Sequence, residues 1–134
     1  LTKEAEFIRS YIHLLRLRYA DRVDIRFEVG DLPDGYQMPP LILSVFVENA
    51  FKHGVSYDAP SFIHVSLQVI GGRLVFKCAN SKHAKRMPIP GGIGLANVRK
   101  RLQLIYGENY HLEINDENEI YNVVLTIALN KDSS

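Results

Sequence analysis

Asn49, Lys52 and His53 place an amide, an ammonium and an imidazole in the last turn of one predicted helix. The helix is predicted over Pro39–Gly54, with a proline in its first turn and a left-handed glycine cap at its end. Residues three and four apart share a helix face, so the three side chains lie together. They either complement the negative end of the helix or form a site for an anion and its metal. These residues alone leave both interpretations open.

A second candidate anion site is a glycine segment. Gly92, Ile93 and Gly94 stand directly before a helix that is predicted over Leu95–Tyr106. Small residues at a helix start expose backbone N–H groups at the positive end of the helix dipole, which suits an anion. No Gly-Lys-Ser/Thr follows, and Asn97 occupies the third glycine position of a dinucleotide fingerprint. Alone, the segment is as typical of a plain helix entry as of an anion site.

The elements around these two segments predict an α+β fold. The apolar periodicity indicates a helix, a strand, a helix, a hairpin of two strands, a loop, a helix and two final strands. Gly71-Gly72 predicts the hairpin turn, and the alternation of the second hairpin strand breaks at Asn80. We therefore expect a two-layer sandwich in which a mixed, largely antiparallel sheet carries its helices on one face. The remaining predicted elements are a helix over 1–20, strands over 23–29, 62–70, 73–79, 110–115 and 120–129, and a surface loop over 81–90.

Two helices carry apolar stripes that must pack against something. The stripe of the first helix fits either the sheet of this domain or an upstream helix, and the stripe of the last helix is expected to be buried. His13 is expected at the edge of the first stripe, and Cys78 as a small core residue rather than a nucleophile. The first stripe contains Phe7, Ile8, Tyr11, Ile12, Leu14 and Leu15, and the last contains Leu95, Val98, Leu102 and Ile105.

The composition excludes several classes of protein. The chain has 134 residues and 16 Lys and Arg against 15 Asp and Glu, a net charge of +1, so no nucleic acid is expected as the main partner. A single cysteine suits a reducing compartment. No apolar run approaches the roughly 20 residues of a membrane span. No signal peptide is expected, and a start without Met suggests a piece of a longer chain.

Together, the two segments resemble a known family. Glu48-Asn49-x-x-Lys52-His53-Gly54 and the downstream Gly-Gly-Ile-Gly-Leu-x-Asn-x-x-x-Arg-Leu resemble the ATP-binding domain of sensor histidine kinases, within the gyrase, Hsp90, histidine kinase and MutL ATPase fold. The segment from Pro39 to Gly54 is most similar to the LytS-type kinases. The resemblance covers the chain from Glu6 to Leu129, with both motifs in the family's order.

The resemblance implies ATP and Mg²⁺ as ligands and gives each motif residue a role. Asn49 falls on the asparagine whose side-chain oxygen holds Mg²⁺, and hard oxygen ligands suit that ion. Lys52 and His53 fall on positions near the phosphates. The backbone of Gly92, Ile93, Gly94 and Leu95 would meet the triphosphate, and residues 81–90 would form the lid over the nucleotide.

The sequence departs from the family at two positions. Asn80 stands near the place of the aspartate that reads the adenine amino group, and its neutral amide oxygen can still accept that N–H. Val45 stands where hydrolysing relatives carry a water-activating glutamate, and Glu48 points about 100° away from Asn49. We therefore expect poor ATP hydrolysis. Transfer to a histidine needs no such base, because a neutral imidazole already carries a lone pair.

The resemblance also implies the surroundings of this domain. Residues 1–20 would be the tail of the dimerisation and phosphoacceptor region, and residues 21–134 the ATP-binding catalytic domain. No phosphoacceptor segment is present, so the γ-phosphoryl would pass to a histidine elsewhere in the same or a partner protomer. The parent would be a homodimer at the cytoplasmic side of the bacterial inner membrane and would signal to a response regulator, whereas this piece is expected to be soluble.

Two alternatives remain open. The first is a degenerate nucleotide-binding or interaction module without kinase activity, in which Asn80 has abolished useful affinity for ATP. The second is a different enzyme of the same fold, such as an anti-sigma-factor kinase that acts on serine, which the dimerisation-like first helix disfavours. Nucleotide titration separates the first alternative from the kinase, and the acid lability of phosphohistidine separates the second.

Overall fold

The structure is a computed structural model that describes residues 1–19, 23–32, 36, 38, 42–54, 60–81, 92–117 and 119–129, with only the backbone of 53, 54 and 92–94. The predicted lid over 81–90 falls outside these residues except for Ser81. The elements in chain order are α1 (Thr2–Tyr19), β1 (Val23–Val29), α2 (Leu43–Gly54), β2 (Ser61–Ile70), β3 (Arg73–Ser81), α3 (Gly92–Tyr106), β4 (Tyr110–Asp116) and β5 (Ile120–Ala128). Among the described helices, none has both the length and the apolar character needed to cross a bilayer.

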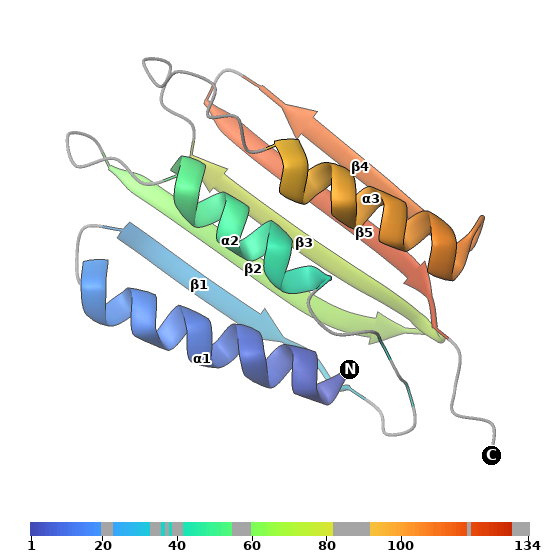
Figure 1. Cartoon of the computed structure of the whole chain (residues 1–134). Helices are drawn as coiled ribbons and strands as arrows, with labels where there is room; N and C mark the ends of the chain where they lie inside the picture. The colour runs from blue at the N-terminus through green and yellow to red at the C-terminus, as the bar shows by residue number, and fades with distance from the viewer. Residues whose placement is uncertain are drawn as a thin grey trace.

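One five-stranded mixed sheet forms the first layer, with the strand order β1-β2-β3-β5-β4 (Figure 1). β1 and β2 are parallel and are joined by a crossover that contains α2, whereas the other neighbouring pairs are antiparallel. The predicted hairpin is confirmed: Gly71 and Gly72 connect β2 to β3 with φ values of 57° and 78°. Both values are left-handed, as the tight turn of a twisted hairpin requires.

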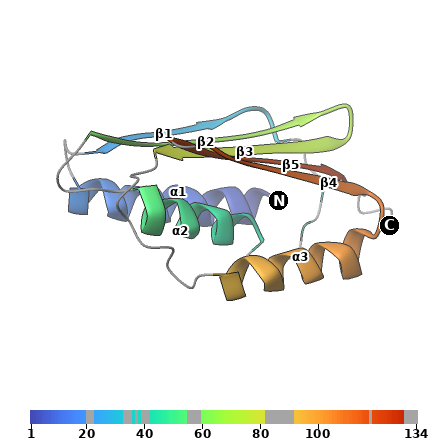
Figure 2. The ribbon, with the colours of Figure 1, turned by 90° about the horizontal axis from the view of Figure 1, so that it is seen from above.

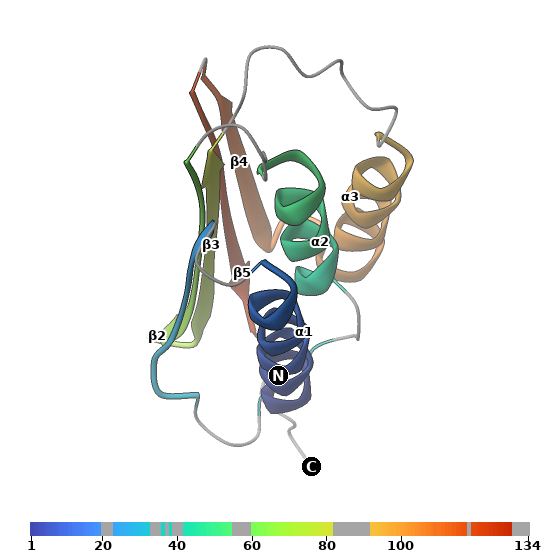
Figure 3. The same cartoon turned by 90° about the vertical axis from the view of Figure 1, so that its left-hand side faces the viewer.

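The three helices form the second layer and all cover the same face of the sheet (Figure 2). α1, α2 and α3 lie side by side, with α2 in the middle (Figure 3). The predicted two-layer α+β architecture is therefore confirmed. The opposite face of the sheet carries mostly polar side chains, as expected for a sheet with one solvated face.

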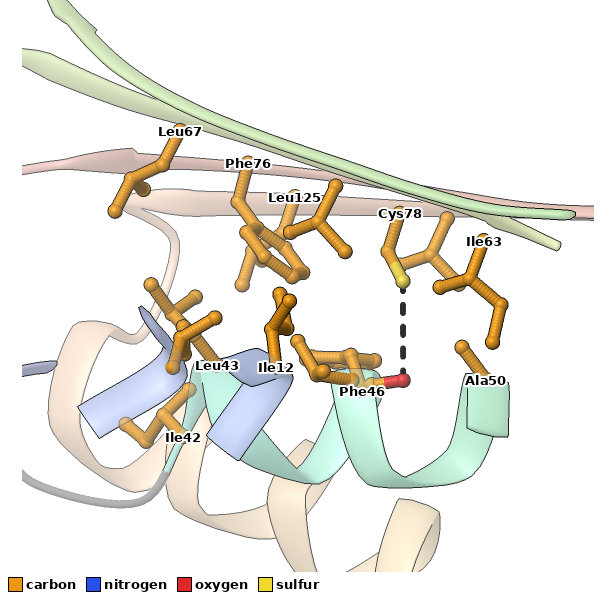
Figure 4. Packing of buried hydrophobic residues seen from close by; sticks show 14 of the residues in the cluster. Ile12, Ile42, Leu43, Phe46, Ala50, Ile63, Leu67, Phe76, Cys78 and Leu125 are labelled. Atoms are coloured by element: carbon orange, nitrogen blue, oxygen red, sulfur yellow. Dashed lines mark hydrogen bonds between the residues drawn. The ribbon is translucent and has the colours of Figure 1, made fainter. Parts of the chain in front are cut away.

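The core lies between the sheet and the three helices, with α2 over its centre. Phe46 and Ala50 of α2 face Phe76, Cys78 and Leu125 of the sheet (Figure 4). The Cys78 thiol points at the Phe46 carbonyl oxygen, with 3.9 Å between Sγ and O. Complete burial raises the pKa of this thiol to about 12, so it stays protonated and behaves as the small core residue that the sequence predicted.

The central helix begins later than predicted. α2 starts at Leu43, and Ile42 forms a bend in front of it, so the predicted start at Pro39 is wrong; residues 39–41 themselves lie outside the described residues. The reason is a tertiary contact. Glu4 of α1 accepts hydrogen bonds at Oε1 from the backbone N–H groups of Leu43, at 2.9 Å, and Ser44, at 3.3 Å. A carboxylate at this point stabilises the first turn of the helix.

Two predicted boundaries near the glycine segment also move. β3 continues through Asn80 and Ser81, because Asn80 pairs with Ile63 of β2 and Tyr121 of β5. The predicted break at Asn80 is therefore wrong: neighbouring strands on both sides outweigh the lost alternation. α3 begins at Gly92 rather than Leu95.

The apolar stripes of α1 and α3 are narrower than predicted. Ile8 and Ile12 of α1 are completely buried, whereas Phe7 and Leu14 on the flanks of the stripe are 44% and 65% exposed. On α3, Val98 and Leu102 are buried, Tyr106 packs against the core, and Ile105 is exposed. Because helix positions advance by about 100° per residue, a step of four from Leu102 reaches Tyr106 and continues the stripe, which the predicted step of three does not. His13 lies on the exposed side of α1, at the edge of the stripe.

Candidate functional site

The C-terminal end of α2, the N-terminal end of α3 and the C-terminal end of β3 lie at the same end of the molecule (Figure 1). The side view shows the same arrangement, with the C-terminal end of α2 and the N-terminal end of α3 both at the upper end of the helical layer (Figure 3). Both segments that the sequence singled out are therefore brought together by the fold, although about 40 residues separate them. The antiparallel direction of α2 relative to β2 produces this meeting.

Asn49 lies on the flank of α2 that faces α3. Phe51 marks the opposite flank, because its ring contacts Tyr11 and Tyr19 of α1 with centroids 5.9 and 6.3 Å apart. Two residues along a helix correspond to about 200°, so the Asn49 side chain points roughly 160° away from Phe51. Asn49 is half-buried. Asn49 therefore lies on the side of α2 that is turned away from α1.

Glu48 lies on the α1 side of α2. Burial raises the pKa of Tyr11, and the nearby Glu48 carboxylate raises it further. A carboxylate that faces Tyr11 of α1 is turned away from the flank of Asn49. The position four residues before Asn49 is occupied by Val45, which supplies no base. The described residues therefore place no carboxylate of α2 beside Asn49.

Lys52 and His53 occupy the last turn of α2 with Asn49. Lys52 is exposed. The backbone of His53 is helical, whereas its side chain falls outside what the structure describes. The carbonyl end of a helix carries partial negative charge, so a cation close to it is favourable.

The first turn of α3 consists of Gly92, Ile93, Gly94 and Leu95. The first four N–H groups of an α-helix have no acceptor within the helix. In α3 these groups belong to the predicted phosphate-binding segment itself, because the helix starts at Gly92. Leu95, the last residue of the segment, is half-buried.

Asn80 is 1% exposed, and it lies on the sheet face that the helices cover. Its Nδ2 donates a hydrogen bond of 2.9 Å to the carbonyl oxygen of Ser81. A carbonyl can only accept, so this bond determines which end of the amide carries the NH₂ group. Oδ1 is then the end of Asn80 that accepts hydrogen bonds, as the reading of an adenine amine requires.

Asn80 belongs to a row of the covered sheet face that carries polar side chains. The register places Ile63, Asn80, Tyr121 and Asp116 side by side across β2, β3, β5 and β4. The next row inward is entirely apolar and consists of Val65, Cys78, Val123 and Ile114. The two rows beyond it are Leu67, Phe76, Leu125 and Leu112, then Val69, Leu74, Ile127 and Tyr110. Along β3, the side chains on the covered face are therefore apolar until Asn80, at the end where α2 and α3 meet.

Two further residues, Tyr121 and Glu4, belong to the site and its supports but do not stand out in the sequence. Tyr121 is half-buried beside Asn80, and strict alternation from the buried Val123 would have placed it on the covered face. Glu4 is 6% exposed and caps α2 from α1. No pattern in the sequence signals that contact, because 39 residues separate Glu4 from Leu43.

The protein oxygens at this end can hold Mg²⁺ only together with oxygens of a bound ligand. No group of three or more His, Cys, Asp or Glu residues among the described residues is arranged to hold a metal. Asn49 offers one neutral oxygen. Mg²⁺ is often held by one or two protein oxygens and completes its shell with phosphate oxygens and water. The residues present therefore fit an ion that arrives with a nucleotide.

Curated relatives of the chain are sensor histidine kinases. YesM of Bacillus subtilis is 27% identical over 125 residues, which cover 89% of this chain and 22% of the relative. LytS of Staphylococcus saprophyticus is 25% identical over 141 residues, with coverages of 95% and 24%. LytS of Staphylococcus epidermidis is 34% identical over 128 residues, with coverages of 85% and 22%. The chain thus spans 22–24% of the length of these relatives.

The solved structures that resemble this chain in fold are also histidine kinases. The catalytic domain of the histidine kinase ThkA has a TM-score of 0.65 at 19% identity and covers 92% of each chain. This chain has the fold of a histidine kinase catalytic domain. A blue-light activated histidine kinase of Erythrobacter litoralis has a TM-score of 0.64 at 15% identity over 97% of this chain and 46% of that chain. No family model matches the chain. The predicted resemblance to LytS-type sensor histidine kinases is confirmed by the relatives.

Proposed function

We propose that this catalytic domain binds Mg-ATP between α2 and α3 and passes its γ-phosphoryl group to a histidine outside the chain. The observation that carries the proposal is that the C-terminal part of α2, which contains Asn49, the first turn of α3 and the sheet row of Asn80 lie at the same end of the molecule. A site of this kind supplies an oxygen for the metal, free N–H groups for phosphates and an amide oxygen for the base.

In this proposal the phosphates lie between the two helix ends. The N–H groups of Gly92, Ile93, Gly94 and Leu95 bind phosphate oxygens at the positive end of α3. Lys52 and His53 contribute cationic or hydrogen-bonding groups from the last turn of α2. The negative end of α2 would repel phosphates, and a cation held by Asn49 offsets that repulsion. When bound, Mg²⁺ neutralises charge on the transferred phosphoryl group.

Asn80 reads the base at the floor of the site. Its Oδ1 accepts the exocyclic N–H of adenine, while Nδ2 remains bonded to the Ser81 carbonyl. A neutral amide replaces the carboxylate that related kinases place here, so the base is held by an ordinary hydrogen bond rather than a charge-assisted one. We therefore expect adenine to bind more weakly than in a site with an aspartate.

The surroundings of the domain belong to the same proposal. Residues 1–20 form the end of a dimerisation region that precedes a catalytic domain over residues 21–134. The acceptor histidine lies in that region of the same or a partner protomer, in a homodimeric, membrane-attached parent that signals to a response regulator. ATP hydrolysis stays slow, because Val45 and the displaced Glu48 provide no base for water.

The test is a calorimetric titration of the chain with a non-hydrolysable ATP analogue, with and without Mg²⁺. We expect magnesium-dependent binding in the wild type. A contact from a polar group to a charged one is worth about 1.5–3 kcal/mol, so Asn49→Ala should weaken that binding about 10- to 100-fold. Asn115→Ala is the matched control, because Asn115 is exposed on the opposite face of the sheet.

The alternative, a degenerate module without kinase activity, predicts that the analogue does not bind. If folded wild-type chain shows no binding up to millimolar analogue, the kinase proposal fails for this domain and the alternative stands. Binding that Asn49→Ala leaves unchanged would instead refute the metal role of Asn49. Phosphotransfer is then measured on the full-length protein, where an acid-labile product identifies phosphohistidine.

A further inference from the structure

The polar row at the end of the sheet contains a residue to which the site above gives no role. Tyr121 of β5 lies directly opposite Asn80 of β3 in the antiparallel register, so both side chains project from the same sheet face. Directly opposite residues of antiparallel strands have Cβ atoms about 4.5–5.5 Å apart. A group that binds the Asn80 amide oxygen is therefore within reach of the Tyr121 side chain.

Tyr121 is placed between the sheet and α3 rather than turned to bulk solvent. The side chain is half-buried and packs against the core cluster. Burial raises the pKa of its hydroxyl, and the Asp116 carboxylate raises it further. The Arg99 guanidinium of α3 lowers this pKa, and Cys78 of β3 raises it. The hydroxyl therefore interacts electrostatically with groups on both α3 and β3. These two elements bound the proposed base site.

Adenine presents an amine donor next to a ring-nitrogen acceptor, N1. Asn80 can accept from the amine at Oδ1, while one of the two N–H groups of its Nδ2 is held by the Ser81 carbonyl. That bond ties the Asn80 NH₂ group to its own strand. A tyrosine hydroxyl on the neighbouring strand supplies a further donor, which N1 can accept.

We propose that Tyr121 is a second base-reading residue, whose hydroxyl donates to N1 of adenine while Asn80 accepts from the amine. This inference rests on the proposed nucleotide site. Asn80 and Tyr121 together then replace one carboxylate by an acceptor and a donor on adjacent strands. The other two residues of this row are not assigned a role in reading the base, because Ile63 is apolar and Asp116 is exposed.

The experiment compares ADP with 1-deaza-ADP, in which a C–H group replaces N1, by calorimetry in the presence of Mg²⁺. We expect the wild type to prefer ADP about three- to tenfold, the contribution of one neutral hydrogen bond. Tyr121→Phe removes only the hydroxyl and should bind both nucleotides equally. Tyr110→Phe is the matched control, because Tyr110 is half-buried on the same sheet face at the opposite end, and it should keep the wild-type preference.

The ratio of the two affinities separates reading of the base from a structural role. A purely structural tyrosine would change both affinities together and leave their ratio as in the wild type, which would overturn the inference. A wild type that binds both nucleotides equally would overturn it as well. In either case, measurable binding of ADP leaves the proposed function standing. Absence of binding for every nucleotide would refute the proposed function itself, and this inference with it.

Discussion

The contact between Glu4 and the start of α2 should contribute strongly to the stability of the domain. Glu4 is 6% exposed, and its Oε1 accepts from the buried backbone N–H groups of Leu43 and Ser44. Glu4→Ala leaves these donors without the carboxylate. Hydrogen bonds to charged groups contribute about 1.5–3 kcal/mol each, and the longer of the two, at 3.3 Å, is the weaker. We expect the free energy of unfolding to fall by about 2–4 kcal/mol.

The assay is chemical and thermal unfolding followed by circular dichroism. An entropy of unfolding near 2.1 cal/mol/K per residue makes 1 kcal/mol equivalent to about 3–4 °C for a domain of this size, so the midpoint should fall by about 7–14 °C. Glu4→Gln keeps an oxygen acceptor without the charge and should lose about half as much. Glu6→Ala is the control, because Glu6 is exposed on the same helix, and it should change stability by less than about 0.5 kcal/mol. Equal effects of Glu4→Ala and Glu6→Ala would refute the capping role.

Two further predictions concern buried groups. The Tyr106 hydroxyl is the one fully buried side-chain polar atom without a hydrogen-bond partner in the part of the chain that the structure describes, so Tyr106→Phe should leave the free energy of unfolding unchanged or raise it by up to about 1 kcal/mol; a clear loss in denaturant titration would contradict this. The pKa of Cys78 is raised from 9.0 to about 12, so the unfolded chain releases the thiol proton first and stability should decline as pH rises from 9 towards 12. Cys78→Ala should remove that part of the pH dependence, and native Cys78 should react with a thiol reagent only as fast as the chain unfolds; rapid labelling at pH 8 would show that the thiol is accessible.

The strands were predictable because each has one covered face. Alternation over 23–29 matches β1 to the residue, and the ends of β2, β4 and β5 differ from the prediction by one residue. The two glycines of the hairpin are equally informative, because the turn needs two left-handed residues. Both candidate motifs could also be found in the sequence, since their residue types and order are visible without any contact.

The errors arose where a distant segment decides the local structure. The start of α2 is set by a carboxylate 39 residues away, and β3 continues through Asn80 because strands on both sides supply hydrogen-bonding partners. The predicted stripe of α3 ended at Ile105 instead of Tyr106, because both positions are apolar enough to pass a periodicity test. Which of the two side chains is buried depends on the residues that pack against α3.

The sequence by itself determined the elements, their order and the chemistry of Asn49, Lys52 and the glycine segment, because these depend on residue type and local spacing. Only the tertiary structure decided that Asn80 and Tyr121 are neighbours and that Glu4 holds the start of α2. Strand register and helix packing bring together residues that are far apart in the chain, and neither is encoded in any short segment. The polar row beneath the two helix ends is therefore a property of the folded sheet rather than of any one stretch of sequence.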